Sequence, residues 1–203
     1  MPVAAWSFSH SPTRKLRSSV DKPIGLAASS ASWGIAGRLQ LKADPFVFGR
    51  GGEEVLACTQ AGIPCSVVPG LSSITAAPAL AGIPLTHRGV AQSFTVVSGH
   101  LPPGDPDSTI DWAGLAGSVE SLILLMAVRN LSRIAAYLVN SGRPPATPVA
   151  CIQHAATPRH RVIRCTLADL AASEVDLQVE NPAVIIVGPT VPVLPAGDGD
   201  DSL

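Results

Sequence analysis

The sequence predicts an α/β fold in which short strands alternate with helices. Apolar segments of strand length recur through the second half of the chain, most clearly at Leu122–Val128 and Ala183–Val187. Segments with apolar residues at helical spacing lie between them. Glycine and proline, as at Gly82 and Pro84, separate the two kinds of segment. Strands interleaved with helices form a helix-covered sheet, and such sheets bind ligands at loops that follow the carboxyl ends of strands.

The composition excludes several classes of protein. Of the 203 residues, 46% are hydrophobic, which is enough for one sizeable core or two small ones. A net charge of -1 and 14% charged residues do not fit a nucleic-acid-binding surface, which needs clustered positive charge. The longest apolar runs, Ser121–Val128 and Ala183–Val187, are too short to span a bilayer, so no membrane partner is expected.

The cysteines indicate a reducing compartment. They form no C-x-x-C pair and lie within apolar segments, which is typical of reduced core residues in cytoplasmic proteins. The four are Cys58, Cys65, Cys151 and Cys165. We therefore expect a cytoplasmic protein with neither a disulfide framework nor a metal site.

The two ends of the chain differ from its middle. Met1–Gln40 is rich in serine, has Asp21 as its single acidic residue and shows no period of 2 or 3.6. We expect residues 1–38 to form a disordered leader; the alternative is an organellar transit peptide, although no amphipathic arginine helix is evident. Residues 195–203 are expected to form a disordered acidic tail.

A glycine-rich loop opens the ordered part of the chain. Lys42–Glu54 reads K-A-D-P-F-V-F-G-R-G-G-E-E, and its glycines can adopt positive φ angles that let a ligand approach the backbone. Phe46 and Phe48 are expected to fold inward, since large aromatic side chains tend to be buried. The elements predicted around this loop are a strand end at Leu39–Lys42, a helix over Glu53–Ala61, a buried strand over Cys65–Val68 and a helix over Ile74–Ala81 capped by Ser72 or Ser73.

The second half is predicted to be a separate α/β unit, with a domain boundary near Thr86–Gln92. Its predicted strands are Ser93–Ser98, Leu122–Val128, Val149–His154, His160–Thr166 and Ala183–Val187. Its predicted helices are Asp111–Gly117, a helix capped by Asn130 that Gly142 ends, and Leu167–Ser173. If the strands share one sheet, five loops gather at one edge as a candidate binding rim: Ala43–Arg50, Ser72–Ser73, Gly99–His100, Met126–Arg129 and His154–Ala156.

Six ordered motifs resemble one enzyme family. They are D-P-F-V-F-G-R-G-G-E-E, A-G-I-P-C-S-V-V-P-G, A-G-I-P-L-T-H-R-G, S-F-T-V-V-S-G-H, L-L-M-A-V-R-N-L and N-P-A-V-I-I-V-G. From Leu39 to about Val193 the chain resembles the uroporphyrinogen-III C-methyltransferases of the tetrapyrrole methylase superfamily. The resemblance implies a tetrapyrrole methylase-like fold of two α/β domains. Residues 39–90 would be the remnant of an N-terminally truncated first domain, and residues 91–194 the second domain.

The resemblance also implies an activity. By this resemblance the protein is expected to be like the family's members, which are usually homodimers and hold S-adenosylmethionine between the two domains. They transfer two methyl groups to uroporphyrinogen III, which gives precorrin-2 on the way to sirohaem and cobalamin. Such a transfer depends mainly on positioning, because the methyl carbon must be aligned with the attacking carbon at about 3–3.5 Å. No metal is implied.

Site residues follow from the resemblance, position by position. The implied cofactor contacts are Ala43, Asp44, Val47, Ser72, Ser73, Met126 and Ala155. The implied contacts to substrate carboxylates are Arg50, His87, Arg88, His100 and Arg129. Each has a simpler interpretation as well: Met126 as core, Ser72 and Ser73 as helix caps, Asp44 as a turn residue, and His87–Arg88 as a solvated turn.

The chain departs from the family pattern in two places. Ala43 stands alone where the family has two glycines, and no G-x-G-P-G-D motif precedes it. No residue is therefore assigned as a general base. The alternative to an active methyltransferase is a truncated, catalytically silent relative that binds cofactor weakly or pairs with an intact subunit. A related methylase with another substrate is a third possibility.

Overall fold

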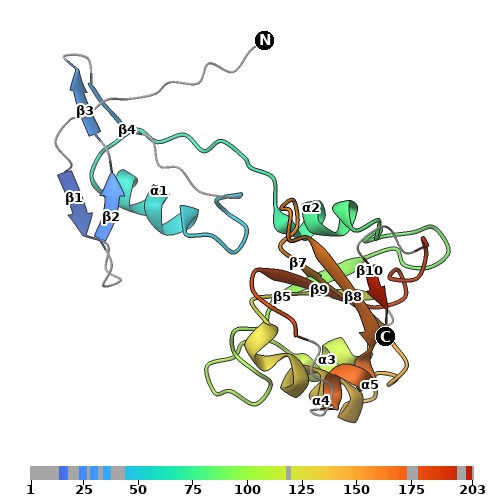
Figure 1. Cartoon of the computed structure of the whole chain (residues 1–203). Helices are drawn as coiled ribbons and strands as arrows, with labels where there is room; N and C mark the ends of the chain where they lie inside the picture. Colours follow the sequence, from blue (N-terminus) through green and yellow to red (C-terminus); the bar gives the residue numbers. More distant parts are fainter. Residues whose placement is uncertain are drawn as a thin grey trace. The chain divides into compact units, whose positions relative to one another are not determined.

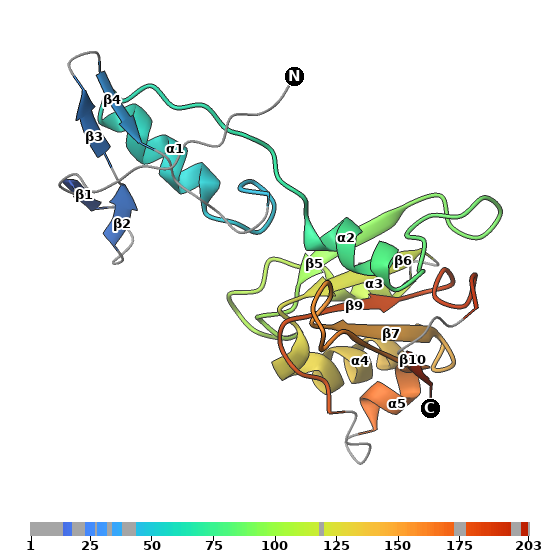
Figure 2. The same ribbon diagram turned by 45° about the horizontal axis from the view of Figure 1, so that its top comes forward.

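The computed structural model describes residues 44–117, 120–172 and 178–195, together with the backbone of five short strands outside these ranges. The chain divides into two compact units, Met1–Leu71 and Ser72–Leu203. Figure 1 and Figure 2 show the elements of each unit. No helix among the described residues has the length and apolar character needed to cross a membrane.

The described part of the first unit contains one helix and two pairs of short strands. β1 (Arg14–Arg17) pairs with β2 (Pro23–Leu26), and β3 (Ala28–Ala31) pairs with β4 (Gly34–Gly37), both antiparallel. Regular structure thus occurs where the sequence predicts a disordered leader. A two-stranded pair by itself is only marginally stable.

Helix α1 (Gly51–Gln60) follows the glycine-rich loop and begins two residues before the predicted start at Glu53. Gly51 donates a backbone hydrogen bond of 3.0 Å to the carbonyl oxygen of Pro45. A Cβ at Gly51 would lie 2.6 Å from that oxygen, so the tight turn requires glycine. Among residues 44–71, Gly51 and Cys58 are the buried ones, so this part of the unit forms no substantial core of its own.

Three predictions for residues 44–71 are wrong, because few of these residues are buried. Cys65–Val68 forms no strand and is exposed, because none of the described strands pairs with it. Cys65 is therefore not the core residue that the apolar segment suggests. Phe46 and Phe48 are 58% and 50% exposed instead of folded inward. The predicted strand end at Leu39–Lys42 lies outside the described residues.

The second unit is built on a mixed sheet with the order β10-β8-β7-β9-β6-β5. Its strands are β5 (Phe94–Ser98), β6 (Ser121–Leu125), β7 (Pro148–Gln153), β8 (Arg161–Thr166), β9 (Ala183–Val187) and β10 (Asp200–Ser202). β5 and β6 are parallel, whereas β9 runs antiparallel to both β6 and β7. The acidic tail, predicted to be disordered, carries β10, which pairs in parallel with β8.

Helices cover both faces of this sheet (Figure 2). α2 (Ser73–Leu80) packs on one face. The opposite face carries α3 (Trp112–Gly117), α4 (Leu131–Asn140) and α5 (Leu167–Ala171). Strand side chains alternate between the two cores, so Leu122 and Leu124 contact the α4 side whereas Ile123 contacts the α2 side. The predicted α/β fold is confirmed.

The two compact units meet between Leu71 and Ser72, before the predicted boundary at Thr86–Gln92. The reason is packing, because Ile74, Ala77 and Ile83 are buried in the core on the α2 face of the sheet. These residues therefore belong to the compact body of the second unit. The assignment of residues 39–90 to a first family domain stays a prediction.

Candidate functional site

The loops after β5, β6 and β7 lie at one edge of the sheet. Ser98 is paired with Leu125, Leu125 with Val184, and Val184 with Ile152. These partners form one row across the sheet. Because β9 runs antiparallel to both β6 and β7, the row lies at the carboxyl ends of β5, β6 and β7. Three of the five predicted rim loops are thus brought together within the second unit: Gly99–His100, Met126–Arg129 and His154–Ala156.

Backbone strain is concentrated in these loops. Met126, His154 and Ala156 have positive φ angles of 55°, 47° and 62°. The left-handed conformation costs a residue with a Cβ about 1–2 kcal/mol, and it persists only where the surroundings enforce it. Such strain is typical of binding and catalytic sites. β6 consequently ends at Leu125, three residues before the predicted end at Val128.

Met126 is exposed between two buried neighbours. It is 50% exposed, whereas Leu125 is 8% and Ala127 is 0% exposed. The interpretation of Met126 as core is therefore wrong. A polarisable thioether on a solvent-accessible rim can contact a flat, aromatic ligand.

Gly99 and Asn130 hold the first two rim loops together. A Cβ at Gly99 would lie 2.6 Å from the Cβ of Ala127, so the close approach of the loops requires glycine. The sequence predicts that Asn130 caps α4, but its side chain makes no capping hydrogen bond. Instead its Nδ2 donates to the carbonyl oxygens of Gly99, at 2.9 Å, and His100, at 3.0 Å. Nothing in the local sequence distinguishes this role from capping, because the two carbonyl groups lie 30 residues away in the chain.

The third rim loop is held by a buried histidine. His154 Nε2 lies 3.5 Å from Glu180 Oε2, and the His154 backbone N–H donates to the carbonyl oxygen of Pro182. Glu180 is held in turn, since its backbone N–H donates to Gln153 Oε1 at 2.6 Å. These contacts tie the loop after β7 to the segment just before β9. Ala155 follows it as a half-buried rim residue.

The predicted substrate contacts of the second unit occupy two different edges. His100 and Arg129 are exposed on the rim, where His100 Nδ1 lies 2.8 Å from Ser98 Oγ. His87 and Arg88 are exposed in the turn before β5, and a five-residue strand extends about 16 Å. Figure 1 shows this turn at the opposite edge from the loops after β5 and β6. The structure therefore does not bring His87 and Arg88 to the rim.

Ser72 acts as the N-cap of α2, as its simpler interpretation predicts. Its Oγ accepts a hydrogen bond of 3.3 Å from the backbone N–H of Ile74. Ser73 is the first residue of the helix and is exposed. Capping uses one lone pair of the Ser72 hydroxyl, so its O–H group is still able to donate to a ligand.

The predicted contacts in the first unit lie on the glycine-rich loop. Asp44 Oδ1 accepts from the backbone N–H of Phe46 at 3.0 Å, and Asp44 Oδ2 accepts from that of Gly70 at 3.2 Å. This carboxylate therefore joins two segments that are 26 residues apart. Val47 is exposed on the same loop, and Ala43 lies outside the described residues.

Arg50, at the end of this loop, keeps part of its hydrogen-bonding capacity unused. Its Nε lies 3.8 Å from Glu53 Oε1, but its Nη2 is buried and has no hydrogen-bond partner. A buried guanidinium N–H without an acceptor is unfavourable, and a ligand carboxylate would supply the acceptor. Among the described residues, no group of three or more histidine, cysteine, aspartate or glutamate side chains is placed to hold a metal ion.

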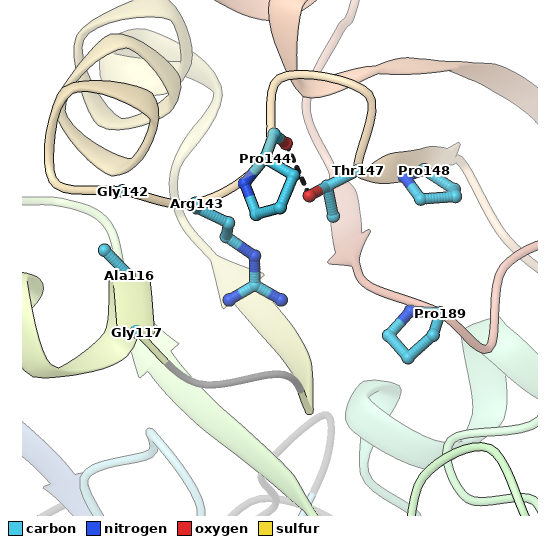
Figure 3. Close-up of a pocket in the computed structure, with 8 residues that line it drawn as sticks. All are labelled: Ala116, Gly117, Gly142, Arg143, Pro144, Thr147, Pro148 and Pro189. Carbon is cyan, nitrogen blue, oxygen red and sulfur yellow. Dashed lines mark hydrogen bonds between the residues drawn. The ribbon is translucent and has the colours of Figure 1, made fainter.

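A pocket of about 400 Å³ lies at the other edge of the second unit's sheet (Figure 3). Its lining is mainly apolar and includes Pro144, Pro148 and Pro189. Arg143 is buried there and donates to the carbonyl oxygens of Leu115, Glu120 and Val187 at 2.7–3.2 Å. Burial lowers the pKa of this guanidinium. Arg143 thus serves as a structural link between α3, β6 and β9.

A mixed α/β sheet with strained, partly exposed loops at the carboxyl ends of its strands is typical of a domain that binds a small ligand. The comparison with known families shows which kind of ligand-binding domain this is. The family model for Tetrapyrrole (Corrin/Porphyrin) Methylases matches residues 43–171, which is more than half of the chain. The protein belongs to the tetrapyrrole methylase family.

Individual relatives agree with this assignment. The chain is 45% identical over 148 residues to a uroporphyrinogen-III C-methyltransferase from Priestia megaterium, covering 73% of this chain and 62% of that protein. It is 47% identical over 154 residues to a siroheme synthase from Azotobacter vinelandii, covering 75% of this chain and 33% of that protein. The chain therefore spans less than two thirds of these relatives.

A solved structure shows the same fold. The uroporphyrin-III C-methyl transferase from Thermus thermophilus, complexed with S-adenyl homocysteine, matches with a TM-score of 0.65 and 40% identity. The match covers 77% of this chain and 64% of that protein. The resemblance inferred from the six sequence motifs is thus confirmed.

Proposed function

We propose that this protein binds S-adenosylmethionine and serves the C-methylation of uroporphyrinogen III to precorrin-2. The observation that carries the proposal is the exposed, left-handed Met126 on the rim of a methylase-family sheet. The similar Thermus thermophilus protein was solved as a complex with S-adenyl homocysteine, which is what S-adenosylmethionine becomes after it gives up its methyl group. By the same resemblance, we expect a cytoplasmic homodimer.

The residues of the second unit suit such a cofactor. Met126 offers an apolar, polarisable contact to the adenosine, and the neighbouring rim backbone offers hydrogen-bonding groups. Ser72 and Ser73 supply hydroxyl groups, and Ala155 forms a small-residue wall. Asp44 and Val47, on the glycine-rich loop of the first unit, are proposed as cofactor contacts by resemblance alone. The cofactor supplies the reactive methyl group, while the protein binds and orients it and excludes water.

The substrate carries several carboxylates, which calls for cationic contacts. Arg50 is the strongest candidate, because its buried Nη2 has no hydrogen-bond partner. His100 and Arg129 are exposed on the rim and can add further contacts. His87 and Arg88 are proposed as substrate contacts by resemblance, although they lie at the other edge of the sheet. No general base is assigned.

A second candidate function is a catalytically silent relative that pairs with an intact methylase subunit. Its support is the apolar surface of the first unit, where several large side chains are exposed. They are Phe46, Val47, Phe48, Leu56, Val67, Val68 and Leu71. Monomeric proteins seldom expose this many neighbouring apolar side chains without a binding role. Such a protein would retain the cofactor-binding rim without turnover of its own.

Calorimetry with S-adenosylhomocysteine tests the cofactor proposal. We expect Met126→Lys to abolish binding, because a charged side chain replaces the apolar contact. Leu80→Lys is the matched control: Leu80 is equally exposed but ends α2, and its replacement should leave the affinity unchanged. Normal binding by a folded Met126→Lys variant would remove Met126 from the site.

A turnover assay separates the two candidate functions. The purified chain is incubated with uroporphyrinogen III and labelled S-adenosylmethionine, alone and together with an intact methylase. Formation of labelled precorrin-2 by the chain alone supports the enzyme. Cofactor binding without turnover, combined with co-purification with the intact methylase, supports the silent partner.

A further inference from the structure

Asn130 joins the Gly99–His100 loop to the loop that begins with Met126. Its Nδ2 donates to the carbonyl oxygens of Gly99 and His100, at 2.9 and 3.0 Å, so both side-chain N–H groups are used on one turn. It makes no side-chain hydrogen bond to the start of α4, although it occupies the N-cap position. Helix capping therefore does not explain this asparagine.

The turn that Asn130 holds contacts the chain on both sides of Met126. Before Met126, the carbonyl oxygen of Leu125 accepts a hydrogen bond of 2.7 Å from the Gly99 backbone N–H. After Met126, Ala127 lies directly against Gly99, where an added Cβ would be 2.6 Å from the Ala127 Cβ. The Asn130 backbone N–H also donates to the Ala127 carbonyl oxygen at 2.8 Å. Both neighbours of Met126 are thus fixed to the same turn.

These contacts account for the backbone conformation of Met126. A left-handed φ of 55° is disfavoured for methionine and needs surroundings that enforce it. If the turn at Gly99–His100 moves away, the segment from Leu125 to Ala127 can relax to an ordinary conformation, and the Met126 side chain changes direction. Asn130 is the side chain that links this turn to the segment after Met126.

We infer that Asn130 is a positioning residue that keeps Met126 in its left-handed conformation and its side chain on the rim for cofactor binding. The inference rests on the proposed function for its ligand, but its structural part is independent of any ligand. Asn130 itself need not touch the cofactor. Its effect passes through the Gly99–His100 turn to residue 126.

A double-mutant cycle tests this relay with S-adenosylhomocysteine as the probe. Asn130→Ala should weaken binding about tenfold, as expected for two lost hydrogen bonds that orient a contact residue. Met126→Gly loses the side chain, and glycine adopts positive φ freely. The variant with both changes should therefore bind no more weakly than Met126→Gly alone. Losses that add in the double variant would overturn the relay.

Two further variants control the cycle. Asn140→Ala removes the same residue type from the exposed far end of α4 and should leave the affinity unchanged. Asn130→Asp keeps the size of the side chain but removes the Nδ2 donors, so it should reproduce the loss seen with alanine. It takes the place of Asn130→Ala in the cycle if the alanine variant does not fold.

Methyl NMR supplies a readout that needs no ligand. The chain has two methionines, Met1 and Met126, so labelling with methyl-¹³C methionine gives two signals. Asn130→Ala should shift the Met126 signal, whereas Asn140→Ala should not. Failure of the wild-type protein to bind S-adenosylhomocysteine would refute the proposed function, while a shifted signal would still support the positioning role. An unchanged Met126 signal in folded Asn130→Ala would overturn the inference.

Discussion

The two compact units use their apolar residues in opposite ways. In the second unit, two clusters of buried side chains cover both faces of the sheet, and alternate strand residues belong to one cluster or the other. In the first unit, Gly51 and Cys58 are the buried residues of 44–71, while Phe46, Phe48 and Leu56 are exposed. The second unit therefore has the packing that stabilises a fold by itself, whereas the 44–71 segment depends on local hydrogen bonds such as those of Asp44.

This difference extends to the candidate site. The rim loops of the second unit are held by a continuous sheet and by contacts from Gly99, Asn130 and His154. The glycine-rich loop of the first unit is held by the Asp44 carboxylate and by the turn between Pro45 and Gly51. The candidate residues of the second unit are thus held by more of the fold than those of the glycine-rich loop.

A pair of leucine substitutions should show the largest difference between the units. Leu138→Ala, on the buried face of α4, should lower the free energy of unfolding by about 2–5 kcal/mol. Leu56→Ala, on the exposed side of α1, should change it by less than about 0.5 kcal/mol. Urea denaturation followed by circular dichroism measures both. A comparable loss at Leu56 would mean that the first unit has a core of its own.

Arg143 provides a polar test of the same core. Arg143→Met keeps much of the side-chain volume but leaves the carbonyl groups of Leu115, Glu120 and Val187 without this donor. A hydrogen bond from a charged donor contributes about 1.5–3 kcal/mol, so a loss of at least that size is expected in the same urea experiment. A variant as stable as the wild type would show that water or relaxation satisfies these carbonyls.

The capping box of α5 should give a smaller and pH-dependent effect. Hydrogen bonds from the Thr166 hydroxyl and backbone N–H to the Asp169 carboxylate hold the pKa of Asp169 below its ordinary value of 3.8. Because the folded-state pKa is lowered, the stabilisation is present above the unfolded-state pKa and is lost as the pH falls through the folded-state value. Asp169→Asn should therefore lower stability by about 1 kcal/mol at pH 7 and less at acidic pH. Equal losses at both pH values would contradict this assignment.

The strands of the second unit are predicted well because the pattern of apolar residues along the sequence indicates which segments are buried. β5, β7, β8 and β9 lie within one residue of their predicted bounds, since their side chains face two cores. β6 is predicted too long because the change to a left-handed backbone at Met126 has no signature in hydrophobicity. The role of Asn130 is missed for a similar reason, as it depends on carbonyl groups that only the folded sheet brings near.

The first unit is predicted less well because its patterns have no matching partners. The apolar run at Cys65–Val68 resembles a buried strand, but none of the described strands pairs with it. Phe46 and Phe48 are large apolar side chains, but residues 44–71 form no core in which they could be buried. Local composition can indicate that a side chain favours burial, but it does not show whether another element packs against it.

An amide NMR titration with S-adenosylhomocysteine tests the central claim most directly, because it shows which edge of the second unit binds the cofactor. We predict that the largest shifts occur at Gly99, Met126 and Ala155, on the three rim loops, with little change around Arg143 at the opposite edge. Shifts centred on the pocket beside Arg143, or no shifts at saturating ligand, would contradict the proposed cofactor site.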